Sequence, residues 1–444
     1  MDTLTDAIEK AQQLVDLTLG AGATEADVFL QLGQTTHVTW QNEHLAQSSG
    51  DVCGLAVRAW SGDKVALLTT NNLASTHLAA LSRFAVQEAN QGIVSPPDLC
   101  TTTNEAISAA DIWTDDSRAV DENVAEFKRL VSSLQSNISS FQGMLHISLS
   151  ESRLATILVN SSTFKAAYTS RNYRLWAWIE GSAGHQTIAV SSRNFKDLIP
   201  RILEQQVHVN PAFLVGESRH APAGYCQVVF SPVAGADIAH TLGTLFMADR
   251  LMVDLKPLLK HMGRQIASSA LTLIDDSVIQ DGVRSRPFDD EGTPSQSTTI
   301  LEHGILRALL HTRYTAATLG MYANGKATRA EIWKQPRSSI STIYIQKGTE
   351  EPEDLFRQMQ RGIFVTNVLR PGRIQGGKGK FMIVVQGWWL EHGKPVYPVS
   401  GVSLSSPIFD LLRNLRTCGT DLQFSSLSDG AGSPSIFIEK MLVE

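Results

Sequence analysis

With 444 residues, the chain is too long for one compact core, because single cores stop growing beyond about 250 to 300 residues, and two or three domains are expected. Its 43% hydrophobic and 18% charged residues are ordinary for a folded globular protein, so the composition gives no reason to expect disorder. The net charge of −6, with Lys and Arg scattered along the chain, argues against direct nucleic-acid binding, which depends on a basic surface.

The sequence also bears on where the protein functions. Its first residues, MDTLTDAIEKAQQLV, carry acids early and lack the basic and apolar regions of a signal peptide. No stretch approaches the roughly 18 apolar residues that a membrane-spanning helix requires. The cysteines form no CxxC pair and suit a reducing compartment; they are Cys53, Cys100, Cys226 and Cys418. We therefore expect a cytoplasmic protein that does not contact membranes.

Residues 1–108 are expected to form an N-terminal α+β domain. Apolar residues at helical spacing predict one helix over residues 4–19 and a second over residues 72–92. Between them, alternating apolar residues predict short strands at 28–32, 38–40, 52–60 and 65–68. Pro96-Pro97 and the polar run that follows predict a linker to the next domain.

Residues 109–222 are expected to form a central α+β domain of similar plan. Apolar residues at helical spacing predict a helix over residues 121–138. Closely spaced strands are predicted after it, at 144–149, 154–159, 164–169, 173–179 and 187–190. A helix from Asp197, with Pro200 tolerated in its first turn, is expected to close the domain.

Residues 223–444 are expected to form a β-rich C-terminal domain. A strand over residues 225–230 leads through Ser231-Pro232 into a predicted helix over residues 234–244. Later segments predict mostly strands and long loops, with a last helix over residues 408–415. Because helices and strands are segregated along the chain rather than alternating, the predicted fold class is α+β.

One stretch of this third segment resembles a known family. It contains Pro287-Phe288-Asp289-Asp290-Glu291-Gly292, then a strand ending at Glu302-His303-Gly304, and then Asn324-Gly325-Lys326-Ala327-Thr328-Arg329. In this order the motifs resemble the central signature of the TldD/PmbA family. That family is linked by name to modulation of DNA gyrase and by chemistry to zinc-dependent proteolysis.

The metal-binding branch of that family carries His-Glu-x-x-x-His on the helix after the strand. Two imidazoles one turn apart can hold zinc, and the Glu can act as general base on the metal-bound water. The corresponding positions in this sequence are Ala239, His240 and Thr244, none of which is the required residue. No two of the twelve His stand three to five residues apart anywhere in the chain. We expect no catalytic zinc and interpret His240 as an ordinary helix residue.

Two loops of the signature supply candidate residues for a peptide channel. They are Asp289, Asp290 and Glu291 in the first loop, and Asn324, Gly325 and Arg329 in the second. Adjacent carboxylates could bind a hard cation or the amino group of a peptide, because they accept charge-assisted hydrogen bonds. The alternative, which the sequence favours for the acids, is that they shape their loop. Asn-Gly suits a tight turn whether or not substrate lies nearby.

Other catalytic motifs are absent from the sequence. The run from Gly372 to Gly379 matches GxxxxGK, but Gly379 stands where a phosphate-binding loop needs Ser or Thr, and a strand is predicted to follow instead of a helix. No GxSxG motif appears, and no Cys has a His near it in the sequence. Cys418 lies near the place where metal-binding members supply a distal thiolate, but without a His pair we expect an inert thiol.

The resemblance favours the PmbA, or TldE, branch of the family. It implies a non-catalytic subunit of a heteromeric peptidase, which completes a channel and admits unfolded peptide to the zinc site of a TldD-like partner. We expect no cofactor in this chain, with zinc only in the partner, and a homodimer is possible when the chain is alone. Apolar residues that could lie at the subunit interface, or equally in the core, are Trp333, Trp388 and Trp389.

Two alternatives from other functional classes stay open. The chain could be a self-standing metallopeptidase whose metal site is assembled from residues distant in sequence. It could also be a regulatory binding protein, acting on gyrase or another protein, that has no peptidase partner. Zinc content, peptide cleavage that chelators inhibit, and copurification with a TldD-like subunit distinguish these three hypotheses.

Overall fold

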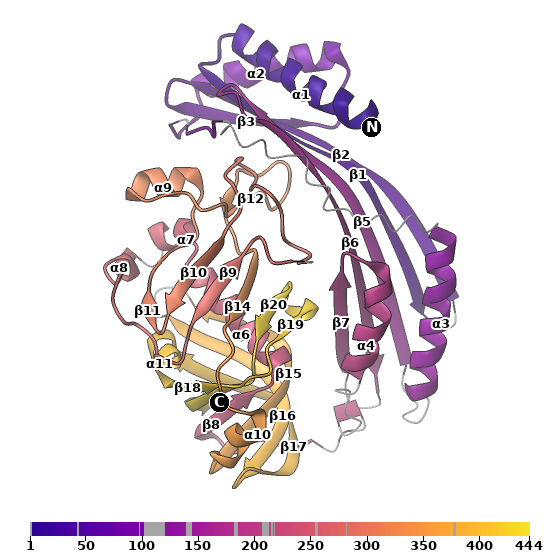
Figure 1. The fold of residues 1–444 in the computed structure, drawn as a ribbon, viewed down its shortest axis with the longest axis vertical. Coiled ribbons are helices and arrows are strands. Elements are labelled where there is room, and N and C mark those ends of the chain that lie inside the picture. Colours follow the sequence, from indigo (N-terminus) through magenta and orange to yellow (C-terminus); the bar gives the residue numbers. More distant parts are fainter. Residues whose placement is uncertain are drawn as a thin grey trace.

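The computed structural model describes residues 2–41, 44–96, 98–101, 120–138, 144–181, 185–206, 213–214, 216, 218–253, 256–280, 282–375 and 379–444. These residues form an α+β structure, as predicted, with a curved sheet along one side of a β-rich C-terminal part (Figure 1). No helix among the described residues is long and apolar enough to cross a membrane.

The N-terminal part consists of one seven-stranded antiparallel sheet with helices. Its strands are β1 (Glu25–Gln41), β2 (His44–Ser61), β3 (Lys64–Thr70), β4 (Ile93–Val94), β5 (Met144–Asn160), β6 (Lys165–Glu180) and β7 (His185–Ser192). Its helices are α1 (Asp2–Gly20), α2 (Ser75–Asn90), α3 (Val120–Ile138), η2 (Phe195–Asp197) and α4 (Leu198–Gln206). The spatial order of the strands is β4-β3-β2-β1-β5-β6-β7.

Strand β1 joins the first two predicted segments in this single sheet, because it pairs with β2 on one side and with β5 on the other. The chain between residues 101 and 120, which includes the predicted boundary at 108/109, lies outside the described residues. The boundaries 1–108, 109–222 and 223–444 therefore stay a prediction, while the shared sheet is a property of the fold.

The prediction of many short strands in this part was wrong. Residues 28–32 and 38–40 belong to one long strand, β1, and the pairs predicted within 144–159 and 164–179 are likewise the single strands β5 and β6. The polar residues that suggested breaks include a buried ion pair in mid-strand, in which Arg171 Nε donates to Glu151 Oε1 at 2.8 Å. Paired charges satisfy each other within a sheet, so the strands continue through them.

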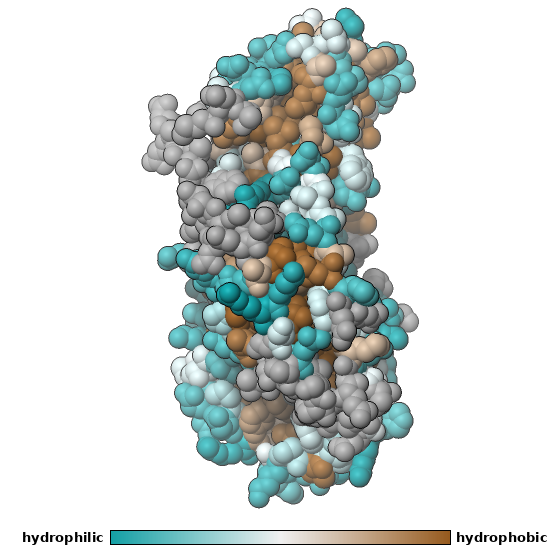
Figure 2. All heavy atoms as spheres, turned by 90° about the vertical axis from the view of Figure 1, so that its right-hand side faces the viewer, coloured by the Kyte–Doolittle hydropathy of each residue, from teal (hydrophilic) through white to brown (hydrophobic). Residues whose placement is uncertain are grey.

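The two faces of the sheet have different partners. One face is covered by α1 and α2 at one end, over residues such as Leu30 and Val57, and by α3 and α4 at the other, over Leu149 and Leu175. Figure 2 views the molecule from the right-hand side of Figure 1 and shows hydrophobic patches near its top and its middle, with hydrophilic residues between them. The opposite face contacts the C-terminal part, and Phe288 from that part packs there.

The C-terminal part contains two six-stranded sheets and a two-stranded one. The first sheet has the order β11-β10-β9-β14-β20-β19. Its strands are β9 (Leu273–Asp276), β10 (Ser297–Glu302), β11 (Ile305–Leu306), β14 (Thr342–Ile345), β19 (Gln423–Ser425) and β20 (Ala431–Ser433). The small sheet pairs β12 (Ala327–Thr328) with β13 (Arg337–Ser338).

The second six-stranded sheet has the order β17-β16-β15-β8-β21-β18, and an additional pairing of β17 with β21 closes five of its strands into a barrel. Its strands are β8 (Gly224–Phe230), β15 (Arg361–Gln375), β16 (Lys380–Glu391), β17 (Lys394–Pro407), β18 (Leu415–Cys418) and β21 (Ile436–Val443). The remaining helices are α6 (Pro232–Leu245), α7 (Ala248–Val253), α8 (Lys256–Leu259), α9 (Arg313–Leu319), α10 (Pro352–Arg357), α11 (Ile408–Asn414) and η3 (Ser426–Ser428).

Helix α6 lies between the barrel and the other six-stranded sheet, where it contacts β15 on one side and β14, β19 and β20 on the other. Pro232 at its first turn and the Ser231 hydroxyl, which accepts a hydrogen bond from Ala234 N at 3.4 Å, define where it begins. Gly243 permits close packing, because a Cβ there would meet Ile343 Cδ1 at 2.3 Å. The predicted strand and helix of this region are confirmed.

Candidate functional site

The three degenerate motif positions lie on α6. Ala239 is fully buried and has no donor atom, while His240 is half-buried. The Thr244 hydroxyl donates to Thr241 O at 2.8 Å and accepts from Arg250 Nη1 at 2.8 Å. Burial lowers the pKa of His240, with Asp429 acting in the opposite direction, so this imidazole is neutral at pH 7. One imidazole is the only strong metal ligand among the three positions.

These residues do not fit a zinc ion, which in proteins takes three or four protein ligands. Cys418, the candidate distal thiolate, is buried with its Sγ 3.7 Å from Ala270 O. Burial raises the pKa of its thiol to about 12, so Cys418 is protonated at pH 7. Within the described ranges, no group of three or more His, Cys, Asp or Glu side chains could hold a metal ion.

A cavity of about 270 Å³ lies beside α6, between this helix and the curved sheet. It is lined by residues of β6 and β7 on the sheet side, and by α6, β15, β16 and η3 on the C-terminal side. Among the described residues that line it, Asp237 of α6 is the one with a carboxylate. A larger hollow of about 680 Å³ lies at α1 and α2, remote from α6, and is lined by Gln12, Ser82 and Lys165 among others.

Asp237 is a further candidate residue, which sequence reasoning did not single out. Burial raises the pKa of its carboxyl to about 6, although Oδ1 accepts a hydrogen bond from Gly372 N at 2.7 Å. On the same helix face, the Thr241 hydroxyl donates to Gly372 O at 3.2 Å, so two side chains of α6 hold the backbone of β15. A single acid within the apolar run AGADIAHTLGTL was the signal that could have identified it.

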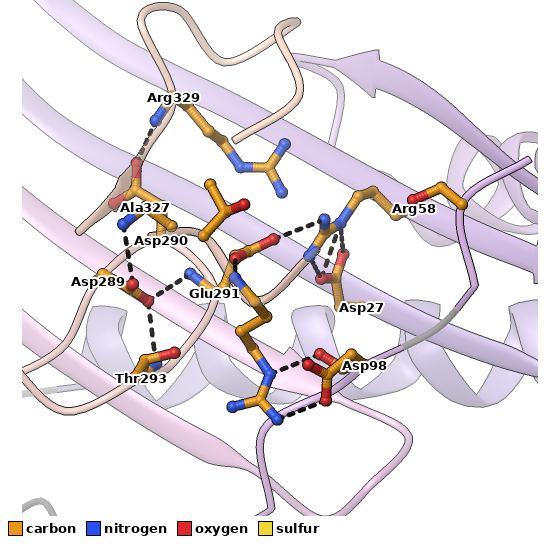
Figure 3. Close-up of polar contacts among 12 residues, drawn as sticks. Asp27, Arg58, Asp98, Asp289, Asp290, Glu291, Thr293, Ala327 and Arg329 are labelled. Atoms are coloured by element: carbon orange, nitrogen blue, oxygen red, sulfur yellow. Dashed lines mark hydrogen bonds and ion pairs between the residues drawn. The ribbon is translucent and has the colours of Figure 1, made fainter. Parts of the chain in front are cut away.

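The acidic loop lies elsewhere, where the C-terminal part meets strands β1 and β2 of the curved sheet (Figure 3). Asp289 is buried, and its two oxygens accept hydrogen bonds from the backbone N–H groups of Glu291, Thr293 and Ala327, each at 2.9 Å. Burial and the charge of Glu291 raise the pKa of Asp289, against these hydrogen bonds. Asp289 thus connects the two signature loops.

Asp290 and Arg329 strengthen the same connection. Asp290 accepts from Arg286 Nη1 at 2.7 Å and from the backbone N–H of Arg329 at 2.6 Å. The Arg329 guanidinium is buried over the ring of Phe29, 5.1 Å from its centroid, and donates to Lys334 O at 3.1 Å. Burial and the neighbouring charge of Arg58 lower the pKa of Arg329 to about 10.

Glu291 links the loop to the sheet. Its Oε1 lies 3.3 Å from Arg58 Nη1, and its Oε2 accepts from the backbone N–H of Arg313 at 2.8 Å. Arg58 also holds Asp27 of β1 through its Nε, at 3.0 and 2.9 Å from the two carboxylate oxygens (Figure 3). Although burial acts to lower it, the charges of Asp27 and Glu291 raise the pKa of Arg58. All three acids of the loop are therefore buried and bonded to their own chain.

Asn324 and Gly325 form the second loop. Asn324 is buried, accepts from His311 N at 2.9 Å and donates to Leu309 O at 2.7 Å. Gly325 has φ of +71°, and a Cβ there would lie 2.4 Å from Pro294 O. The structure thus brings the six signature residues together as buried loop contacts; a role in a peptide channel stays a prediction.

Replacing Gly325 with Ala is expected to lower the free energy of unfolding by about 1 to 3 kcal/mol, because the side chain meets both a left-handed backbone and a carbonyl oxygen. Gly320 is a matched control: its φ is +65°, but a Cβ there would meet nothing within 4 Å. Urea denaturation should show a clearly larger loss for Gly325→Ala than for Gly320→Ala. Equal losses would mean that backbone conformation alone explains the effect.

The remaining candidates divide between core and surface. The GxxxxGK run begins on β15 and ends before β16, so no helix begins at Gly379, as predicted; residues 376–378 lie outside the described part of the chain.

Trp389 is buried in the core and Trp388 is half-buried, whereas Trp333 is 58% exposed. Of the three tryptophans, Trp333 remains a candidate for a subunit interface.

Comparisons with known proteins identify the family and agree with this fold. Residues 223–444 match the family model of the PmbA/TldA metallopeptidase C-terminal domain, which covers half of the chain. A metalloprotease of Methanothermobacter thermautotrophicus is 30% identical over 233 residues, 50% of this chain and 51% of that protein. The metalloprotease PmbA of Escherichia coli O157:H7 is 30% identical over 169 residues, 38% of this chain and 35% of that protein.

The crystal structure of TldE from Thermococcus kodakarensis has the same fold, with a TM-score of 0.83 at 14% identity, over 98% of this chain and 99% of that one. The chain spans about half the length, or less, of the two curated relatives described above. The matched family is one of metallopeptidase-like proteins. This chain belongs to the PmbA/TldD family, which confirms the resemblance found in its sequence.

Proposed function

We propose that this chain is a non-catalytic, PmbA/TldE-like subunit of a cytoplasmic metallopeptidase complex. Its role is to shape the channel through which unfolded peptide reaches the zinc site of a TldD-like partner. One observation carries the proposal: on α6, where the family's metal-binding branch has His-Glu-x-x-x-His, this chain has Ala239, His240 and Thr244. The helix is preserved while the ligands and the general base are not.

Two further observations support a partner. Trp333 and Tyr322, in the segment between α9 and β13, are 58% and 94% exposed. Large exposed aromatic side chains are typical of protein interfaces. The second signature loop lies between these two residues in the sequence. Hydrogen bonds to Asp289 and Asp290 connect it to the acidic loop, and Glu291 connects that loop to Arg58 of the curved sheet. The substrate expected for the complex is an unfolded peptide.

Peptide cleavage by three samples tests the proposal: this chain alone, a TldD-like partner alone, and an equimolar mixture, each with an unfolded peptide. We expect no turnover from this chain alone, and a mixture that cleaves faster, or at different bonds, than the partner alone. A partner whose motif Glu is changed to Gln should leave the mixture inactive, because that residue supplies the general base. Zinc analysis of each purified subunit should find metal in the partner only.

The two alternatives predict different outcomes. Stoichiometric zinc in this chain, together with turnover that EDTA abolishes, would establish a self-standing metallopeptidase and overturn the proposal. A regulatory binding protein would instead leave cleavage by the partner unchanged on mixing. It would also copurify with a target other than a TldD-like subunit.

A further inference from the structure

The cavity beside α6 combines features that the signature motifs do not predict. It lies between the inner face of the curved sheet and the C-terminal part, and its volume of about 270 Å³ is just below the roughly 300 to 1,000 Å³ of small-molecule pockets. This size suits one large side chain of a peptide. Its walls come from two parts of the fold that are far apart in sequence, β6 and β7 on one side and α6, β15 and β16 on the other.

The wall on the sheet side is aromatic. Trp176 and Trp178 alternate with buried residues of β6 and therefore project from the face opposite to α3 and α4. Their rings lie 5.9 Å apart, and the ring of His185 stacks on Trp178 with a centroid distance of 3.9 Å and an interplanar angle of 11°. Indole faces attract cations more strongly than other aromatic side chains do.

The opposite wall of the cavity carries the Asp237 carboxylate, which has no cationic partner among the described side chains. Asp237 is buried, its one hydrogen bond in the described structure is that from Gly372 N, and no Lys or Arg of the described residues forms an ion pair with it. A buried carboxylate is costly unless it is paired, and a guest cation would supply the missing charge. An anionic guest is excluded by the same carboxylate.

Gln386 adds a polar group of a second kind. It lines the cavity, is only 2% exposed, and its Nε2 has no hydrogen-bond partner within the described structure. Two β-bulges set its position, because the register of β15 with β16 shifts between Val365 and Asn367, and that of β16 with β17 shifts between Val385 and Gly387. Bulges commonly redirect side chains next to functional sites.

We propose that this cavity binds one basic side chain of a peptide, with an arginine guanidinium held between the Trp176 and Trp178 rings and the Asp237 carboxylate. Guanidinium is favoured over ammonium because it is planar, stacks on indole and pairs with carboxylates through two N–H groups. The inference rests on the proposed function only for the source of the ligand, the unfolded peptide.

Calorimetry on the full chain, without any partner, tests this proposal. The probes are two acetylated and amidated tripeptides, Gly-Arg-Gly and Gly-citrulline-Gly, which differ in charge but hardly in shape. We expect the arginine peptide to bind at least tenfold more tightly. Asp237→Asn should abolish this difference, because Asn keeps the acceptor for Gly372 N but loses the charge.

Asp429→Asn is the matched control. Asp429 follows η3 directly, is exposed and does not line the cavity, so its loss changes the net charge equally and should preserve the preference for arginine. Thermal unfolding of each variant verifies that it is folded. Equal affinity for the two peptides, binding of neither, or a preference that persists in Asp237→Asn overturns the proposal. Because no partner or turnover is involved, these outcomes leave the proposed subunit role untouched.

Discussion

Replacing Lys326 with Met is expected to lower the free energy of unfolding by about 3 to 5 kcal/mol, the usual cost of breaking a buried ion pair. Lys326 and Asp275 are both 0% exposed, with Nζ 2.7 Å from Asp275 Oδ2. The same Nζ donates to Ser277 Oγ at 2.6 Å and to Gln296 O at 2.9 Å. Methionine fills a similar volume, so the loss of stability arises from the unpaired Asp275 carboxylate and from the three acceptors that lose their donor, Asp275 O among them, rather than from a void.

Urea denaturation measures this loss of stability, and two further variants serve as controls. Lys380→Met removes the exposed partner of Glu444 and should cost less than about 1 kcal/mol, because exposed ion pairs contribute little. Adding Asp275→Asn to Lys326→Met should restore part of the stability, because the stranded charge is then gone. A loss below about 1 kcal/mol for Lys326→Met would show that Asp275 becomes hydrated or protonated at little cost.

Replacing Asp237 with Asn is expected to stabilise the protein at pH 7 by about 2 to 3 kcal/mol, which is the free energy of a pKa rise of roughly two units. Burial raises this pKa from 3.8 to about 6, so between these pH values the folded state binds more protons than the unfolded state. The contribution of Asp237 to stability should therefore fall as pH rises from about 4 to 6 and stay constant above that range. Asparagine keeps the acceptor for Gly372 N and carries no charge.

Thermal unfolding of the parent chain and Asp237→Asn across pH 4 to 7 checks this expectation. The variant should unfold several degrees higher at pH 7, and its advantage should disappear towards pH 4. No gain at pH 7 would mean that the carboxylate is stabilised by solvent or by a cation. If Asp237→Asn both stabilises the protein and abolishes arginine binding, then the Asp237 carboxylate is required for binding although it lowers the stability of the fold.

Local patterns predicted the strand and the helix that carry Ala239, His240 and Thr244. The strand at 225–230, its Ser-Pro cap and the following helix are present as β8 and α6 because hydrophobic periodicity and capping act within a few residues. The same reasoning placed Ala239, His240 and Thr244 on this helix. It failed for β5 and β6, where Glu151 and Arg171 resembled turn residues, since the partner that satisfies each charge lies on the neighbouring strand.

For the acidic loop, too, the local sequence predicted the element but not its contacts. Its sequence predicted that Asp289, Asp290 and Glu291 shape a loop, but their partners Ala327, Arg329 and Arg58 come from other segments. The cavity beside α6 was not predicted at all, because Trp178, Asp237 and Gln386 are ordinary residues in their own elements. Only the packing of the curved sheet against the C-terminal part brings them together.

Local periodicity thus sufficed for the α+β class, and the resemblance of its motifs sufficed for the family, since both depend on which side chains stand at neighbouring positions. The single curved sheet, the burial of the signature acids and the cavity around Asp237 depended on the tertiary structure. Whether a residue is buried, and which distant residue it pairs with, depends on the segments that pack against it. No short stretch of sequence contains that information.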